Sequence, residues 1–205
     1  MNIQQVYGNK GKCLSGLLKI LPKLFNDKRG FFFESWNKKI WEDALKNQNL
    51  SFKSFVQDNH TRSKKGTLRG LHYQIEPYSQ GKLVSCLSGR IYDVAVDLRR
   101  DSETFGSWAG TELTSENNIQ LWIPSGFAHG FLTLSEEADV FYKVDEYWNA
   151  SCERSLNWND KKLEIDWPID LLEGTEFVLS NKDKNAPFLE QLSNIDFFKG
   201  NNNKY

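Results

Sequence analysis

A histidine, His72, lies in the middle of a short strand-like segment, TLRGLHYQ, at residues 67–74. The ordinary pKa of an imidazole lies near neutral, so this side chain could take up or release a proton at physiological pH. Three further side chains have types that take part in proton transfer or stabilise charge: Lys82, Tyr142 and Asp183. The sequence therefore contains the groups that an acid–base reaction needs.

Each of these residues also has an ordinary structural explanation. His72 could be a buried histidine whose ring nitrogens are hydrogen-bonded by neighbours. Lys82 could be a solvated lysine of an edge strand, and Tyr142 a half-buried strand aromatic. Asp183, within NKDKNAP, could be a turn residue. Taken singly, the four residues leave both explanations open.

Strand geometry raises a question about Arg69 and His72. Side chains alternate between the two faces of a strand, and these positions differ by an odd number, so a regular strand places them on opposite faces. They can face one site only if Gly70 marks a bulge or the strand twists sharply there.

The composition narrows the class of protein. The chain has 205 residues, enough for a domain with a real core, and a formal net charge of −1. This charge gives no electrostatic reason to expect nucleic acid or an anionic membrane as a partner. The cysteines are odd in number, widely spaced and lack a C-x-x-C motif, which indicates neither a disulfide framework nor a zinc site. The N-terminal MNIQQVYGNKGKC lacks the apolar core of a signal peptide, so we expect a cytoplasmic protein.

Most of the expected elements are short strands. The segment NKKIWEDALKNQNL, Asn37 to Leu50, has one apolar helical face and predicts a short helix. KLVSCLSGRIYDVAVDLR predicts two strands joined at Ser88-Gly89, and SWAGTEL, IQLWIPSG, HGFLTL and VFYKVDEYW are further strand candidates. Many short strands without interleaved helical segments favour a mainly β, antiparallel sandwich or barrel.

The C-terminal region is expected to be different. FLEQLSNIDFF, residues 188–198, predicts one helix, and KGNNNKY, residues 199–205, predicts a frayed tail. No internal repeat and no domain boundary are visible, so residues 1–205 are expected to form a single domain.

Six longer segments have the order and spacing of the conserved segments of a known family: DKRGFFFESW, FVQDNHTRSKKGTLRGLHYQ, QGKLVSCLSGRIYDVAVDLRRDSETFG, LWIPSGFAHGFLTLSE, YKVDEYW and LNWNDKKLEIDWP. From about Leu17 to Leu192 the chain thereby resembles the dTDP-4-dehydrorhamnose 3,5-epimerase family. The resemblance implies a cupin-like antiparallel jelly roll with short flanking helices, a homodimer, and no metal or organic cofactor. It also implies an isomerase that epimerises dTDP-4-dehydro-6-deoxy-D-glucose at C3 and C5 to dTDP-4-dehydro-L-rhamnose, in dTDP-L-rhamnose biosynthesis.

The matched positions imply roles for individual residues. His72 would be the catalytic base, with Asp183 as the carboxylate that orients it. Tyr142 would be the acid on the opposite face of the sugar, and Lys82 would lie beside the carbonyl oxygen where negative charge develops. The substrate-binding positions implied by the same match are Arg29, Glu34, Gln57, Asn59, Arg69, His129, Trp148, Glu153 and Lys182. Among them, Arg69 and Lys182 match positions at or near the diphosphate, and the segment with Arg29 and Glu34 matches one that reaches into the neighbouring subunit's site.

These residue types suit the implied reaction. The C4 ketone acidifies the hydrogens on C3 and C5, and each inversion needs a base on one face, an acid on the other and a cation to stabilise the enolate. No redox step is required, which agrees with the lack of a G-x-G-x-x-G loop after a predicted strand.

One departure from the family pattern is visible. The chain has Tyr147-Trp148 where the family often has two tyrosines, and the second of these is associated with stacking on the thymine. An indole can stack at least as well as a phenol, so we expect base binding to survive.

Three other functions compete with this one. A metal-dependent cupin enzyme usually needs closely spaced histidines on one strand, whereas HYQ at 72–74 lacks the second imidazole. A non-catalytic sugar-nucleotide module would not need the complete set of acid–base residues. The nearest alternative is an epimerase that inverts only C3 or only C5 of another dTDP-4-keto-6-deoxy sugar.

Overall fold

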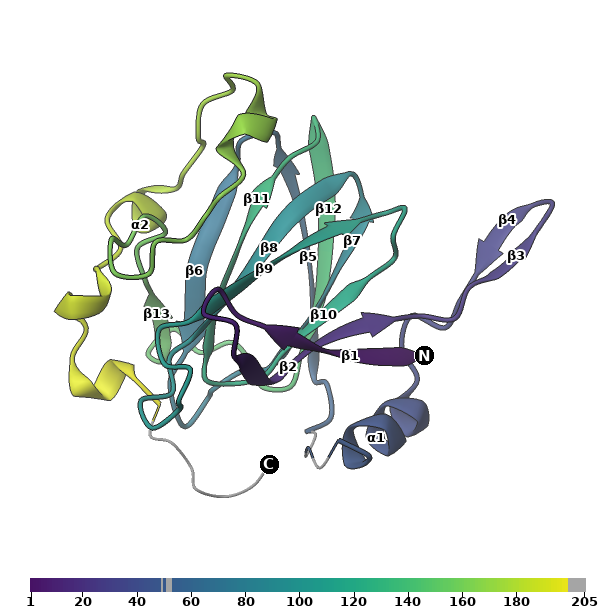
Figure 1. Ribbon diagram of the computed structural model, residues 1–205, viewed down its shortest axis with the longest axis horizontal. Helices are drawn as coiled ribbons and strands as arrows, with labels where there is room; N and C mark the ends of the chain where they lie inside the picture. The colour runs from purple at the N-terminus through teal and green to yellow at the C-terminus, as the bar shows by residue number, and fades with distance from the viewer. Residues whose placement is uncertain (49, 51–52, 199–205) are drawn as a thin grey trace.

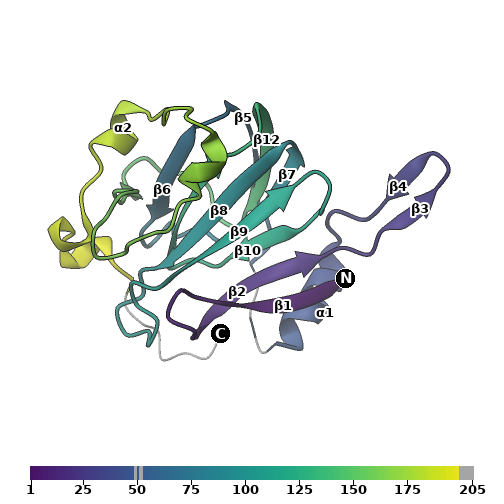
Figure 2. The same ribbon diagram turned by 45° about the horizontal axis from the view of Figure 1, so that its top comes forward.

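The computed structural model describes residues 1–48, 50 and 53–198, and it consists mainly of two facing β-sheets (Figures 1 and 2). The first sheet has the strand order β1-β2-β10-β7-β12-β5, and the second has the order β13-β6-β11-β8-β9. All neighbouring strands within the two sheets pair antiparallel, which confirms the expected fold class.

The strands of the first sheet are β1 (Asn2–Tyr7), β2 (Cys13–Leu21), β5 (Gln57–Lys64), β7 (Lys82–Ser88), β10 (Gln120–Ile123) and β12 (Glu137–Val144). Those of the second sheet are β6 (Leu68–Gln74), β8 (Arg90–Asp97), β9 (Trp108–Thr114), β11 (Phe127–Thr133) and β13 (Glu153–Ser155). A separate hairpin, β3 (Phe25–Asp27) and β4 (Gly30–Phe32), projects from the body of the molecule (Figure 1).

Apolar residues form three packed layers around these sheets. The interior layer joins the facing sides of the two sheets, for example Val84 of the first and Ile91 of the second. The outer side of the second sheet packs Val94 against Leu163 and other residues of the C-terminal segment. Because both of its faces are covered, β8 is buried even at its aspartates.

The third layer covers the outer side of the first sheet and contains helix α1 (Lys38–Lys46). Asn37 caps the helix by accepting a hydrogen bond from the backbone N–H of Ile40. The predicted apolar face is confirmed at Trp41 and Leu45, which are buried, whereas Ile40 is exposed. The helix ends at Lys46, earlier than the predicted segment, part of which lies outside the described residues.

The two strands predicted on either side of Ser88-Gly89 are present, but they belong to different sheets. The chain passes from β7 in one sheet to β8 in the other through Gly89, whose φ is +77°. A Cβ at this position would meet the backbone oxygen of Glu137, so the crossing needs a glycine.

Strand β6 contains the bulge that would bring Arg69 and His72 to one face. On the neighbouring strand β11, His129 pairs with His72 and Phe131 pairs with Arg69. The chain thus advances three residues along β6 where it advances two along β11. Gly70 supplies the extra residue with a φ of +133°, and a Cβ there would meet the backbone of Gly130. The bulge is therefore confirmed.

The single helix predicted at residues 188–198 is wrong. The structure has two 3-10 turns there, η2 (Leu189–Gln191) and η3 (Asn194–Asp196). The side chain of Asp196 accepts from the backbone N–H of Ser193, which would donate to the carbonyl oxygen of Leu189 in a continuous helix, so this local hydrogen bond competes with the helix. The predicted tail at 199–205 lies outside the described residues. The remaining helical elements are η1 (Ile169–Leu172) and α2 (Asn181–Lys184).

Candidate active site

A pocket of about 290 Å³ lies between the two sheets, with walls from β5, β7 and β12 on one side and from β6, β11 and β13 on the other. The predicted residues that line it are His72, Lys82, Tyr142, Asp183, Gln57, Asn59, Arg69, His129, Trp148 and Glu153. Residues widely separated in the chain are thus gathered at one place by the pairing of the strands.

His72 and Asp183 form a hydrogen-bonded pair in this pocket. His72 Nε2 lies 2.6 Å from the Oδ1 atom of Asp183, although the two residues are far apart in sequence. Asp183 is buried in α2, where Ser180 Oγ accepts from its backbone N–H. Burial alone would raise the pKa of Asp183, but the hydrogen bond and charge of His72, with help from Ser180 and Gly70, hold that pKa below its usual range. The carboxylate is therefore ionised at neutral pH and can fix the orientation and tautomer of the imidazole.

Lys82 is a buried cation at the head of β7, with 9% of the residue exposed. Its Nζ donates a hydrogen bond of 3.3 Å to the backbone oxygen of His72, so the ammonium lies beside β6, the strand that carries His72. Burial lowers the pKa of Lys82 to about 8, and the nearby charges of Asp93 and Glu153 oppose this effect. The ammonium form still predominates at neutral pH.

Tyr142 and Arg69 lie in the same pocket on opposite sheets. Burial raises the pKa of Tyr142, so its phenol stays protonated at neutral pH. The Arg69 guanidinium is held by Ser63, whose Oγ accepts from Nε at 2.9 Å, and by the backbone oxygen of Arg62. These contacts leave a fixed cation at the wall of the pocket.

His129 also lines the pocket and makes a second histidine–aspartate pair. Its Nε2 is 2.7 Å from Asp93 Oδ1, and both residues are buried. Burial lowers the pKa of His129 even though Asp93 favours its charged form. The sequence indicated His129 but not Asp93.

Glu153 and Lys182 form an ion pair at the rim, with 2.8 Å between Lys182 Nζ and Glu153 Oε2. Burial tends to raise the pKa of Glu153, but the bond and charge of Lys182 outweigh it and lower that pKa. Lys182 itself is not among the lining residues. Trp148 lines the pocket, yet 57% of it is exposed, so its indole presents an open apolar surface.

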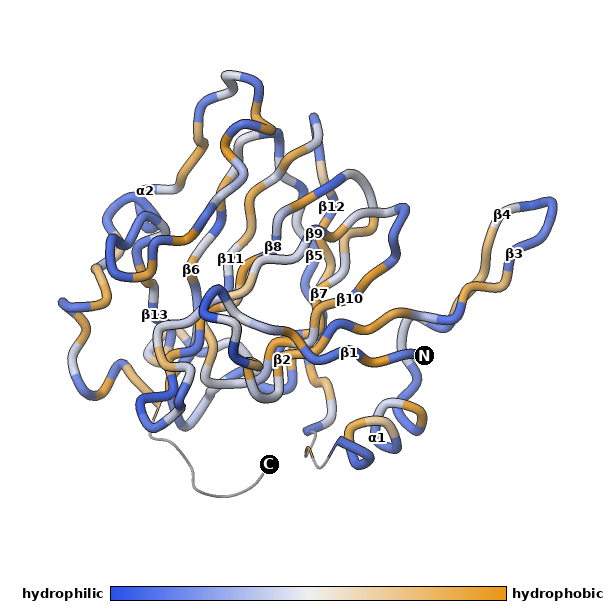
Figure 3. The backbone as a smooth tube through the Cα atoms, viewed as in Figure 1, coloured by the Kyte–Doolittle hydropathy of each residue, from blue (hydrophilic) through white to orange (hydrophobic). Residues whose placement is uncertain are grey.

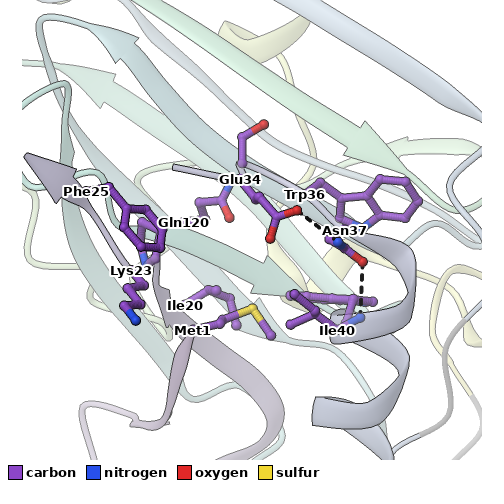
Figure 4. Close-up of a pocket in the computed structure, with 12 residues that line it drawn as sticks. Met1, Ile20, Lys23, Phe25, Glu34, Trp36, Asn37, Ile40 and Gln120 are labelled. Carbon is purple, nitrogen blue, oxygen red and sulfur yellow. Dashed lines mark hydrogen bonds between the residues drawn. The ribbon is translucent and has the colours of Figure 1, made fainter. Parts of the chain in front are cut away.

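Besides Lys182, the predicted residues Arg29 and Glu34 do not line this pocket. Arg29 is in the turn of the projecting hairpin, where its guanidinium bonds Asp27. Glu34 lies beside a separate cavity next to α1 and accepts a hydrogen bond of 3.0 Å from Asn37 (Figure 4). Within a single chain, the structure does not bring these two residues to the other predicted site residues.

The pocket has further lining residues that the sequence did not indicate: Thr61, Tyr73, Gln74, Gln80, Phe131 and Ser180. Strand alternation would have indicated some of them, because Thr61 shares a strand face with Asn59 and Gln74 shares one with His72. Ser180 has no such signal, since it enters the site through the loop before α2.

Two negative findings hold for the described part of the chain. His, Cys, Asp and Glu side chains form no group of three or more there that could hold a metal ion. No helix among the same residues is long and apolar enough to cross a bilayer.

The two-sheet fold with its polar pocket, together with the similarity of the chain to known epimerases, defines it as an isomerase with a cupin fold. Residues 12–191 match the family model of dTDP-4-dehydrorhamnose 3,5-epimerase. The chain therefore belongs to the dTDP-4-dehydrorhamnose 3,5-epimerase family. Its activity is that of a dTDP-4-dehydrorhamnose 3,5-epimerase, in dTDP-rhamnose biosynthesis.

Individual relatives support this assignment over most of the chain. The dTDP-4-dehydrorhamnose 3,5-epimerase of Salmonella typhimurium is 50% identical over 179 residues, which cover 87% of this chain and 93% of the relative. The structure of dTDP-6-deoxy-D-glucose-3,5-epimerase from Legionella pneumophila, in complex with dTDP-4-keto-L-rhamnose, has a TM-score of 0.87 and 42% identity, and covers 98% of this chain and 100% of that one. The structure of a Bacillus anthracis dTDP-4-dehydrorhamnose 3,5-epimerase with TDP and PPi bound has a TM-score of 0.81 and 44% identity. The match covers 92% of this chain and 100% of that one.

Proposed function

We propose that the pocket binds dTDP-4-dehydro-6-deoxy-D-glucose and inverts C3 and C5 by moving protons on opposite faces of the sugar. One observation carries this proposal: His72 and Tyr142 stand on β6 and β12, which belong to the two facing sheets, and both line the same pocket. The ligand in the Legionella structure is a dTDP-keto sugar, and the Bacillus structure holds TDP, a nucleoside diphosphate without the sugar.

His72 is the base in this mechanism. Its Nε2–H donates to Asp183, which leaves Nδ1 as the nitrogen that accepts a proton from the sugar carbon. When the proton arrives, the imidazolium is stabilised by the carboxylate 2.6 Å away. Asp183 therefore acts as an orienting residue for the base.

Lys82 stabilises the enolate. Removing a hydrogen next to the C4 ketone places negative charge on the carbonyl oxygen, and a buried ammonium interacts with that charge more strongly than one in water. Tyr142, kept protonated by its raised pKa, then returns a proton to the opposite face of the carbon.

The nucleotide part of the substrate lies toward the rim. The fixed guanidinium of Arg69 suits a diphosphate oxygen, and Lys182 adds a second cation beside Glu153. The exposed indole of Trp148 stacks on the thymine, and Gln57 and Asn59 complete the wall. Residues 1–205 act as one epimerase domain in this proposal.

The projecting hairpin supports a homodimer in which Arg29 and Glu34 reach the site of the other subunit. Phe25, Phe31 and Phe32 on this hairpin are more than half exposed, at 53%, 54% and 65%. Figure 3 shows hydrophobic stretches along β3 and β4, outside the body of the molecule. Exposed apolar groups on a projecting arm are typical of a surface that a second subunit covers.

Replacing Tyr142 with phenylalanine is expected to damage net inversion more than hydrogen exchange. The variant keeps the base, so protons still leave the carbon, but it lacks the acid that returns them to the opposite face. Proton NMR in deuterium oxide would report deuterium incorporation at C3 and C5 together with the configuration of the product. Equal loss of exchange and inversion would argue against Tyr142 as a separate acid.

Co-expression of Arg29→Ala and His72→Ala chains is expected to restore activity if the hairpin crosses to the partner. In a mixed dimer, one site receives an intact His72 from its own chain and an intact Arg29 from the other. Random pairing then yields about one quarter of the wild-type activity at low substrate concentration. Mixed dimers of His72→Ala and Lys82→Met provide the control, because both residues belong to the same chain's site and no intact site forms. Absence of rescue in a dimeric Arg29→Ala and His72→Ala sample would show that Arg29 serves its own chain.

A further inference from the structure

Gln74 is a buried amide whose hydrogen-bonding groups face two loops, the one after β6 and the one between β12 and β13. Only 4% of this residue is exposed, at the end of β6. Its Nε2 donates to the backbone oxygen of Tyr78 at 2.6 Å and to that of Tyr147 at 3.1 Å. Its Oε1 accepts from the backbone N–H of Asn149 at 2.7 Å. Because a primary amide has only two donor hydrogens, both are used by the protein and neither is left for a substrate.

Two of these three bonds lie on either side of Trp148. Tyr147 precedes the tryptophan and Asn149 follows it, so Gln74 fixes the backbone at both flanking residues. Gln57 adds a third contact, since its Oε1 accepts from the backbone N–H of Trp148 at 3.2 Å. The main chain is thereby fixed around an indole whose side chain remains exposed.

We propose that Gln74 is a positioning residue that orients the Trp148 indole for stacking on the nucleotide base. This inference rests on the proposed stacking role of Trp148. An aromatic ring already held in its stacking orientation loses less conformational freedom when the base arrives. Gln74 thereby raises affinity for the base without touching it.

A Gln74→Glu variant tests this proposal with little change of shape. The carboxylate has no donor hydrogens, so it faces the carbonyl oxygens of Tyr78 and Tyr147 without a bond and repels them. We expect the Kd for dTDP to rise about tenfold, the order of effect of one lost base-stacking contact. The Kd for inorganic pyrophosphate stays within about twofold of wild type, because Arg69 is held by other residues. KM rises while kcat at saturating substrate changes little.

Gln120→Glu is the matched control. Gln120 is another buried glutamine on a strand of the sandwich, and its Nε2 donates to Ser85, away from the Trp148 loop. The Gln120→Glu variant is expected to leave the Kd for dTDP and the Kd for pyrophosphate unchanged. If Gln74→Glu does not fold, as judged by circular dichroism, Gln74→Met removes the same hydrogen bonds without adding a charge and serves as the test.

A double-mutant cycle with Trp148→Ala separates this inference from the proposed function. Trp148→Ala should itself weaken dTDP binding about tenfold, and adding Gln74→Glu should then have no further effect on that Kd. Unchanged dTDP binding in Trp148→Ala would overturn the stacking role and the inference together. Three results would overturn the inference alone: additive effects, wild-type dTDP affinity in the Gln74 variant, or equal weakening of dTDP and pyrophosphate.

Discussion

His72→Ala is expected to abolish the exchange of the C3 and C5 hydrogens with solvent deuterium. In the proposed mechanism the imidazole removes both hydrogens, and Asp183 at 2.6 Å only orients it, so no neighbouring group replaces it. A positioned general base contributes about 100- to 10,000-fold in rate, and loss of both exchange reactions by at least this factor is the expected result. Proton NMR in deuterium oxide measures the two carbons separately.

His60→Ala is the matched control for this experiment. His60 is also paired with an aspartate, since its Nε2 lies 3.2 Å from Asp139 Oδ1, but it is on β5 between two pocket-lining positions and does not line the pocket. The control should exchange hydrogens at the wild-type rate. Exchange at that rate in His72→Ala would remove His72 from the role of base.

Lys82→Met is expected to lower kcat by about 100- to 1000-fold, taking the loss of one oxyanion-stabilising donor as the guide. Methionine is nearly as long as lysine and apolar, so it fills the buried position at the head of β7 but provides no charge for the enolate oxygen. Steady-state kinetics at saturating substrate measures the effect. Lys143→Met is the control, because this lysine does not line the pocket and bonds Asp58.

The pH dependence of kcat provides a second measurement of the role of Lys82. Burial lowers the pKa of this ammonium to about 8, while Asp93 and Glu153 favour its charged form and Lys182 disfavours it. The charged form predominates below this pKa, so activity should be retained there and should fall as the pH rises through about 8. The phenol of Tyr142 does not account for this decline, because burial raises its pKa. The same decline in Lys82→Met would contradict the assignment.

Much of the fold could be predicted from local patterns. The alternation of Val94 and Val96 with Asp93, Ala95 and Asp97 indicated a strand, and the apolar face containing Trp41 and Leu45 indicated a helix. The failure at residues 188–198 has a local cause as well, since the side chain of Asp196 bonds to the backbone N–H of Ser193, a group that a continuous helix would need.

The sequence by itself determined the types of reactive groups and the strands that carry most of them, because both depend on residue identity and short-range periodicity. Only the tertiary structure decided which groups meet. Arg69 and His72 share a face because Gly70 inserts a bulge into β6, and Asp183 reaches His72 across a long stretch of chain. The physical reason is that pairing between strands and contacts between distant segments depend on the packing of the whole chain. No spacing within one segment encodes the distance between residues on facing sheets.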